Sequence, residues 1–283
     1  MFAPQQTIAI GTIKITYLPD GKFFVPPSVL YPQVPAHEWE AYTHLLGSDG
    51  RIISNVGAHL IQTGTQTILV DTGVGPQVLN SEKPQFHLSG GELLDSLQQV
   101  GLSPADIDSV FYTHLHVDHI GWTGHSVDGT QTLTFPNARY FVRRAEWQKF
   151  DNPTASRLGV EIALPLLAPR IEFIEDRQEL VPGVQVHATP GHTPGHAALI
   201  ITSHDERLLL LGDSFHNVIG IDHPDWIDLF DEDPNKAAQT RQSLLQEIAQ
   251  PHTRASGIHF APSAFGRLMT DTNGKRVWLP EMP

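Results

Sequence analysis

Three histidines and one aspartate lie within six residues, in the run His114-Leu115-His116-Val117-Asp118-His119. On an extended backbone, side chains two residues apart point to the same side, so His114 and His116 can bind one metal ion. Asp118 and His119 follow where the chain turns, and they are free to face a second ion beside the first. Imidazole and carboxylate ligands suit Zn²⁺, but they also suit Fe, Mn and Co, so ligand type leaves the metal open.

More polar residues of the same kinds follow apolar, strand-like segments elsewhere in the chain. They are Asp71 after 66–70, His192 in the run Thr-Pro-Gly-His-Thr-Pro-Gly-His, Asp213 after 208–211, and His259 in Gly-Ile-His-Phe. The ends of strands in a layered sheet fold converge on one edge, where ligand sites are expected. The sequence therefore predicts one metal site assembled from distant segments.

Apolar periodicity and turn residues predict the elements that must position these side chains. Strands are expected at 8–10, 13–17, 58–62, 66–70, 107–112, 139–142, 171–174, 184–188, 197–202 and 207–211. Helices are expected at 91–100, 144–150 and 234–250, with a short one near Glu38. Pro19-Asp20-Gly21 has the composition of a turn. Strand–loop–helix units in both halves predict an α/β protein, an αββα sandwich, with residues 1–283 forming a single domain.

Composition and charge exclude several classes of partner and site. The net charge of −13 and the lack of a basic face argue against binding to nucleic acid or to anionic membranes. The chain has no cysteine, so disulfides and thiolate metal sites are excluded. Neither a signal peptide nor an apolar stretch long enough to span a bilayer is evident, and a cytoplasmic enzyme is expected.

In type, order and spacing, these residues resemble the five motifs of the metallo-β-lactamase superfamily over Ile61 to Phe260. The resemblance implies two divalent metal ions, with zinc favoured. It assigns His114, His116 and His192 to one ion, Asp118, His119 and His259 to the other, and Asp213 to a bridge between them. Asp71 becomes an outer carboxylate that orients the ligands. A hydroxide held between the two ions would attack a polarised carbonyl or phosphoryl group, with Asp118 and Asp213 in the catalytic set.

Several branches of the superfamily fit the sequence poorly. Metallo-β-lactamases proper usually lack the bridging aspartate, so Asp213 argues against antibiotic hydrolysis. Diiron oxygen reductases carry glutamate at the second histidine of the run and a flavodoxin partner, which His116 and the chain length disfavour. RNA-processing nucleases carry extra motifs or an inserted domain, and the acidic charge does not suit RNA. Glyoxalase II would need a basic C-terminal cluster that is not evident.

The pattern is most similar to acyl-homoserine lactone lactonases and methyl-parathion-hydrolase-like enzymes. Tyr17-Leu18-Pro19-Asp20-Gly21 resembles their opening, and the segment 259–268 resembles the parathion-hydrolase side. Many lactonases place a tyrosine three residues after the bridging aspartate, where His216 stands here, so His216 joins the catalytic candidates. The expected function is opening of lactones or small esters, as in quorum quenching. The alternatives are phosphotriester hydrolysis, then a glyoxalase II-like thioesterase or a mononuclear iron persulfide dioxygenase. A homodimer is left open.

Other residues near the motifs have two interpretations each. Trp122, Phe215, Phe23 and Phe24 either line the substrate mouth or pack in the core. A second group of residues is interpreted as outer or surface histidines, namely His196, His125, His223 and His44. The acidic stretch 222–233 around Trp226 is interpreted as a solvated loop.

Overall fold

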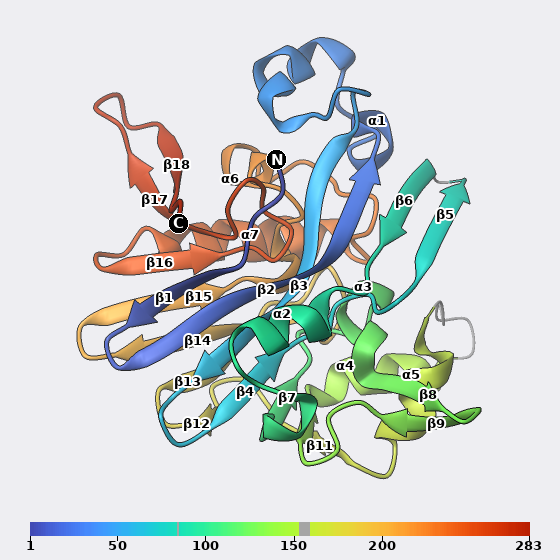
Figure 1. The fold of residues 1–283 in the computed structure, drawn as a ribbon. Coiled ribbons are helices and arrows are strands. Elements are labelled where there is room, and N and C mark those ends of the chain that lie inside the picture. Colours follow the sequence, from blue (N-terminus) through green and yellow to red (C-terminus); the bar gives the residue numbers. More distant parts are fainter. Residues whose placement is uncertain (84, 153–158) are drawn as a thin grey trace.

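The computed structural model describes residues 1–83, 85–152 and 159–283, and within them two β-sheets pack face to face (Figure 1). The first sheet has nine strands, with the order β11-β10-β7-β4-β3-β2-β6-β5 and β1 paired to β2. In chain order these are β1 (Gln6–Ile10), β2 (Ile13–Val25), β3 (Ile52–Gln62), β4 (Thr67–Val70), β5 (Val78–Glu82), β6 (Gln85–Ser89), β7 (Ser109–Phe111), β10 (Arg139–Val142) and β11 (Ile171–Phe173).

The second sheet has seven strands in sequence order. They are β12 (Glu179–Val181), β13 (Val184–Ala188), β14 (Ala197–Ser203), β15 (Glu206–Leu210), β16 (Thr253–Ser256), β17 (Phe265–Thr270) and β18 (Arg276–Pro280). A separate hairpin joins β8 (Gly124–Val127) to β9 (Thr130–Leu133).

Alternation along the strands explains the layering. In β14, Ala197, Leu199 and Ile201 belong to the apolar cluster between the two sheets, together with residues of β1, β2 and β4. Ile200, on the opposite face of the same strand, belongs to the cluster under a helix. Because successive side chains of a strand point to opposite faces, both faces of this sheet are covered.

Helices form the two outer layers. α2 (Leu93–Gln99) and α5 (Val160–Leu167) pack on the outer face of the first sheet, and α7 (Pro234–Ile248) packs on the outer face of the second. Leu244, Leu245 and Ile248 form the apolar stripe of α7. The predicted αββα sandwich is confirmed. That residues 1–283 form a single domain stays a prediction.

Short helices complete the described chain. They are α1 (Pro27–Leu30), η1 (Ala36–Leu45), η2 (Pro104–Asp106), α3 (Val117–Ile120), η3 (Gly121–Thr123), α4 (Arg144–Gln148), η4 (Lys149–Asp151), η5 (Gly212–Ser214) and α6 (Ile219–Asp222). No helix in the described ranges has the length and apolarity needed to cross a membrane.

The predicted turn at Pro19-Asp20-Gly21 is wrong. β2 continues through these residues, and its pairing with β3 shifts register between Pro19 and Gly21, which marks a bulge. Asp20 points inward from this bulge. Its carboxylate accepts hydrogen bonds from the backbone N–H groups of Val74, Gly75, Gly91 and Leu93 and from the indole of Trp122. Asp20, which suggested a turn, instead holds together the segments that contain Val74, Gly91 and Trp122.

The strand ends bring the candidate site residues to one edge. β4 and β7 are parallel, so Asp71 and the histidine run leave the first sheet side by side. β15 and β16 are parallel in the second sheet, so Asp213 and His259 also follow neighbouring strand ends. His192 lies in the connection from β13 to β14.

Candidate metal centre

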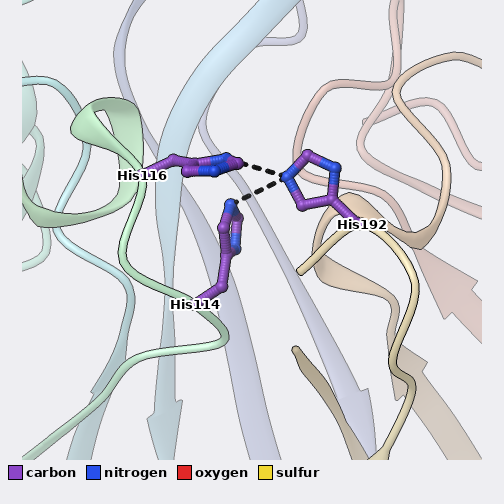
Figure 2. A group of neighbouring side chains, drawn as sticks. All are labelled: His114, His116 and His192. Atoms are coloured by element: carbon purple, nitrogen blue, oxygen red, sulfur yellow. Dashed lines mark hydrogen bonds between the residues drawn. The ribbon is translucent and has the colours of Figure 1, made fainter. Parts of the chain in front are cut away.

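Three imidazole rings meet at the first position of the centre. Nε2 of His192 lies 3.1 Å from Nε2 of His114 and 2.9 Å from Nδ1 of His116 (Figure 2). His114 and His192 are buried, and His116 is partly exposed. Each offers a ring nitrogen within 4.8 Å of the others, which is the arrangement of a three-histidine metal site.

A second group of four lies beside the first. Asp118, His119, Asp213 and His259 also offer one ligand atom each within 4.8 Å of one another. Oδ2 of Asp118 is 3.8 Å from Nε2 of His119 and 3.6 Å from Nε2 of His259. Asp118 lies in α3, the short helix that begins directly after His116, at the point where the sequence allowed a helix to open.

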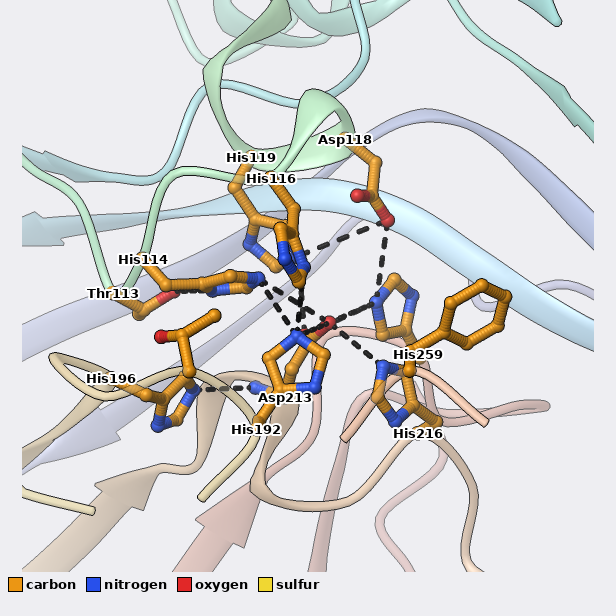
Figure 3. Close-up of polar contacts among 12 residues, drawn as sticks. Thr113, His114, His116, Asp118, His119, His192, His196, Asp213, His216 and His259 are labelled. Carbon is orange, nitrogen blue, oxygen red and sulfur yellow. Dashed lines mark hydrogen bonds and ion pairs between the residues drawn. The ribbon is translucent and has the colours of Figure 1, made fainter. Parts of the chain in front are cut away.

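The Asp213 carboxylate lies between the two groups (Figure 3). Its Oδ2 atom is 3.7 Å from Nε2 of His114 and 3.6 Å from Nε2 of His192. Its Oδ1 atom is 3.2 Å from Nε2 of both His119 and His259. Oδ2 is also 3.3 Å from Nε2 of His259, so the carboxylate as a whole lies within reach of ring nitrogens of both groups, as a bridging ligand requires.

The contacts of the Nδ1 atoms orient three rings toward the two positions. Nδ1 of His119 donates to Asp71 Oδ2 at 2.8 Å, and Nδ1 of His259 donates to the Asn55 carbonyl at 2.6 Å. Nδ1 of His114 lies 3.0 Å from Thr113 Oγ1. Nδ1 of each of these three rings is thus held by a partner outside the centre, and Nε2 points toward the centre.

Burial and unpaired atoms fit the same conclusion. Burial, foremost, holds the pKa of His114, His116 and His192 well below the ordinary histidine value, so these rings are neutral. Three neutral rings whose nitrogens converge in this way offer the donor set that a divalent cation takes. Nε2 of His119 and Oδ1 of Asp213 are buried, and their geometry gives neither a hydrogen bond, although the two atoms lie 3.2 Å apart.

Carboxylates dominate the electrostatics of the second group. Burial alone would lower the pKa of His119, but Asp213, Asp71 and Asp118 raise it well above the ordinary value. Burial alone would raise the pKa of Asp213, but His119 and His259 hold it well below its usual range. Two ligand carboxylates with a third behind them give this region a negative charge that suits divalent cations.

Asp71 lies behind the candidate ligands, where it contacts His119 directly and reaches His114 through Thr113. Its carboxylate accepts from the backbone N–H and the hydroxyl of Thr113, both at 2.8 Å, and from Nδ1 of His119. Burial raises the pKa of Asp71, while His119 and Thr113 lower it. The backbone of Asp71 is left-handed, with φ of 62°, a conformation kept where the surroundings demand it.

The interpretation of 222–233 as a solvated loop is wrong for two of its aspartates. Asp228 and Asp231 are buried, and both face histidines of the centre. Oδ2 of Asp228 lies 3.0 Å from Nδ1 of His216. Oδ1 of Asp231 lies 3.6 Å from Nδ1 of His192, while its other oxygen accepts from Arg241 at 2.9 Å. Acidic composition alone could not distinguish these carboxylates from exposed ones.

His216 stands beside the bridge. Its Nε2 atom is 3.1 Å from Asp213 Oδ2, and the two form a third possible ligand group with His192. Burial would lower the pKa of His216, but Asp228 and Asp213 raise it well above the ordinary value. Asp228 fixes the ring, and Nε2 faces the centre.

His196 lies behind the candidate ligand Asp213, in agreement with its interpretation as an outer histidine. Its Nδ1 atom donates to the Thr189 carbonyl at 3.1 Å and lies 2.8 Å from Thr189 Oγ1. Its Nε2 atom accepts from the backbone N–H of Asp213 at 2.9 Å. Burial lowers the pKa of His196 to about 4. His223 lies apart from the centre, stacked on Trp226 with ring centroids 4.0 Å apart.

The aromatic candidates divide between core and periphery. Trp122 and Phe215 are buried in separate core clusters, which matches the packing interpretation. Phe24 lines a surface cavity of about 610 Å³ that includes none of the metal-ligand candidates. Phe23 packs against Phe230, with centroids 5.9 Å apart. Phe230 was not singled out from the sequence, and it packs against His216 at 5.8 Å.

Comparisons with known proteins agree with this fold and site. The sequence profile of the metallo-beta-lactamase superfamily matches residues 54–259. An N-acyl homoserine lactonase of Bacillus cereus is 31% identical over 169 residues, 55% of this chain and 62% of the relative. The lactonase AttM of Rhizobium radiobacter is 28% identical over 171 residues, 56% of this chain and 61% of the relative. The chain thus matches less than two thirds of the length of either relative.

Solved structures extend the likeness over the whole chain. The structure of AidC, a dizinc quorum-quenching lactonase, is similar with a TM-score of 0.83 and 28% identity, covering 100% of this chain and 99% of that one. The hydrolase AbOPH is similar in fold with the same TM-score, 24% identity and the same coverage. Because the family profile spans most of the chain and includes every proposed ligand, the chain belongs to the metallo-beta-lactamase superfamily.

Proposed function

We propose that this protein is a metal-dependent hydrolase that holds two divalent ions, zinc at both positions, and opens lactones with an acyl substituent. The observation that carries the proposal is the Asp213 carboxylate, which lies within 3.7 Å of ring nitrogens of both ligand groups. His114, His116 and His192 would hold one ion, and Asp118, His119 and His259 the other. Two bound cations would supply an activated water and polarise the carbonyl under attack.

The chain's own residues then position and stabilise the substrate. His216 presents Nε2 beside Asp213, where it can hydrogen-bond an oxygen of the substrate or of the leaving group. Asp228 keeps that ring oriented through Nδ1. His216 thus takes the place of the tyrosine that many lactonases carry three residues after the bridging aspartate. Asp118, with its side chain partly exposed, lies at the open side of the centre.

An aromatic wall beside the centre supports an apolar substituent on the substrate. Phe230 packs against His216, Phe23 against Phe230, and Phe86 against Phe23, with centroids 5.8, 5.9 and 6.0 Å apart. Phe86 and Phe230 are partly exposed, and Phe23, which is buried, packs between them. Apolar surface of this kind favours an acyl chain over a charged group.

Phosphotriester hydrolysis is the second candidate, favoured by His216 at the position of the lactonase tyrosine. A neutral aryl phosphotriester would also suit the aromatic wall. The activities of a glyoxalase II-like thioesterase and of a mononuclear iron dioxygenase are ranked below both, because seven ligands for two ions are present. The cytoplasmic location and the homodimer stay expectations of the sequence alone.

The test is a substrate panel on the zinc- and manganese-loaded protein. It covers acyl-homoserine lactones of several chain lengths, aryl esters, paraoxon, S-lactoylglutathione and nitrocefin, with metal analysis of each preparation and His116→Ala as the inactive control. We expect two zinc ions per chain and lactone opening at least about tenfold above every other substrate. Faster paraoxon hydrolysis would favour the second candidate, and one iron without zinc would overturn both.

A further inference from the structure

Glu146, in α4, is a fully buried carboxylate that the proposed mechanism does not use. Its Oε1 atom accepts from the backbone N–H of Leu115 at 3.1 Å. Its Oε2 atom accepts from the hydroxyl of Thr193 at 2.6 Å and from the backbone N–H of Gly195 at 3.2 Å. A charged side chain is rarely buried unless it is paired and hydrogen-bonded, so these contacts need an explanation.

The donors to Glu146 belong to the two loops that carry the first ligand group. Leu115 lies between His114 and His116, and Thr193 follows His192 directly. The only covalent path between these loops runs through almost eighty residues. A backbone bond from Ala197 to the Thr113 carbonyl, 3.0 Å, joins the loops at their base, and the Glu146 carboxylate joins them next to the ligands.

The packing around Glu146 is tight. A Cβ atom at position 195 would overlap the backbone and Cβ of Glu146, so only glycine permits this approach of α4 to the His192 loop. Gly195 is part of the Thr-Pro-Gly-His repeat that the sequence singled out. The second half of that repeat thus serves α4 and Glu146 instead of adding a ligand.

Lys149 supplies the compensating charge. Its Nζ atom is 3.4 Å from Glu146 Oε1 and 2.7 Å from Glu232 Oε1, with its side chain 7% exposed. The backbone N–H of Glu232 donates to the His192 carbonyl at 3.0 Å. α4 and η4 are therefore connected both to the loops of the first ligand group and to the segment that bears Asp228 and Asp231.

We propose that Glu146 is a positioning residue that fixes the spacing of His114, His116 and His192 and thereby sets the affinity of the metal position they form. This inference rests on the proposed metal centre. The competing explanation is that Glu146 only stabilises the fold. The two explanations differ in one observable, because only a positioning role changes the affinity and geometry of one metal position in protein that is still folded.

The experiment compares Glu146→Gln and Thr193→Val with the wild-type chain and with Asp20→Asn. Glutamine keeps the size of the side chain but has only one acceptor oxygen, so it cannot serve both loops. Thr193→Val removes a single hydrogen-bond donor to Glu146. It serves as the milder variant in case Glu146→Gln fails to fold. Asp20→Asn is the matched control, since Asp20 is also a buried carboxylate that accepts loop N–H groups, yet it contacts neither loop of the first ligand group.

The readouts are zinc affinity by chelator competition, the visible spectrum of the cobalt-substituted protein, and urea unfolding. We expect Glu146→Gln to lower the affinity for one of the two zinc ions about 10- to 100-fold and to alter the cobalt spectrum. Thr193→Val should have a smaller effect on both. Asp20→Asn should lose stability but keep both affinities.

Wild-type affinities and spectra in folded Glu146→Gln and Thr193→Val would overturn the inference and leave the proposed function intact. An equal loss of affinity in Asp20→Asn would also overturn it, because any loss of stability would then have the same effect. A wild-type chain that binds no ion would overturn the proposed function as well.

Discussion

Asp228 and His216 form a buried carboxylate–imidazole pair, with Oδ2 of Asp228 3.0 Å from Nδ1 of His216. The pair places the other ring nitrogen 3.1 Å from the bridging candidate Asp213. The carboxylate comes from a segment whose composition suggested a solvated loop. A carboxylate behind an imidazole fixes the ring's orientation and tautomer, so Asp228 acts on the centre through His216.

Asp228→Ala should lower kcat/KM for the best lactone about 10- to 100-fold, because His216 loses its orienting partner. Asp225→Ala, which removes an exposed carboxylate from the same segment, should leave kcat/KM unchanged. The measurement is the steady-state kinetics of both variants, of His216→Ala, and of the double variant that combines His216→Ala with Asp228→Ala. The double variant should be no slower than His216→Ala alone, and additive losses would contradict the pairing.

Asp213→Asn should uncouple the two metal positions. The amide offers one oxygen to cations where the carboxylate offers two, so one group loses its shared ligand. We expect fewer than two ions per chain, folded protein by circular dichroism, and a fall in kcat beyond the roughly 100-fold that loss of an outer partner costs. Asp118 belongs only to the second ligand group, so Asp118→Asn should leave the binding of the first ion unchanged. Two ions and unchanged turnover in Asp213→Asn would exclude the bridge.

The convergence of the candidate ligands could be predicted from the sequence, partly from local patterns and partly from the family resemblance. His114 and His116 alternate on an extended segment, and His192 and Asp213 follow the strands β13 and β15, whereas His259 lies in a turn after the polar strand β16. The strands with strong apolar runs were also predictable, since burial on both faces leaves a clear signal, as in β14. The hairpin of β3 and β4 follows from a different signal, the turn residues Thr63-Gly64-Thr65 between two apolar runs.

What the sequence missed depends on tertiary contacts. β5 has exposed and half-buried residues in alternation and little apolar content, so no run marks it. Asp20 has the composition of a turn, and only the five donors around it explain why it lies inside a bulged strand. Asp228, Asp231 and Glu146 are ordinary acidic residues by composition. Their burial follows from where the loop 222–233 and α4 pack, which no local pattern encodes.

Asp20→Asn should destabilise the fold by roughly 3 kcal/mol or more, because several buried N–H groups lose a charged acceptor and each unsatisfied group costs about 1–3 kcal/mol. Asp106→Asn is the control: Asp106 accepts from Ser103 in an exposed capping box, and its loss should cost about 1 kcal/mol or less. Urea unfolding of both variants measures the difference. Equal losses would show that Asp20 adds no more than a surface cap does.

His59 gives the fold a dependence on pH that is separate from the metal centre. Its ring is buried between the sheets, where Nε2 lies 2.7 Å from Ser256 Oγ and the ring packs against Tyr17 and Phe265. Burial lowers the pKa of His59 from 6.5 to about 3. Between these two values the unfolded chain binds a proton at this residue and the folded chain does not.

The stability that neutral His59 preserves is therefore complete above pH 6.5 and is lost progressively as the pH falls toward 3, by about 1.4 kcal/mol per pH unit. His59→Gln keeps a partner for Ser256 but cannot titrate. The free energy of unfolding of wild type relative to His59→Gln should therefore fall by roughly 2 kcal/mol between pH 6.5 and pH 5. Because the two proteins share every other histidine and the metal centre, the contributions of these groups to the pH dependence of the unfolding free energy cancel in the comparison. The exposed His37→Gln is the control and should show no such trend. A difference between wild type and His59→Gln that stays constant over this range would mean that His59 is protonated in the fold.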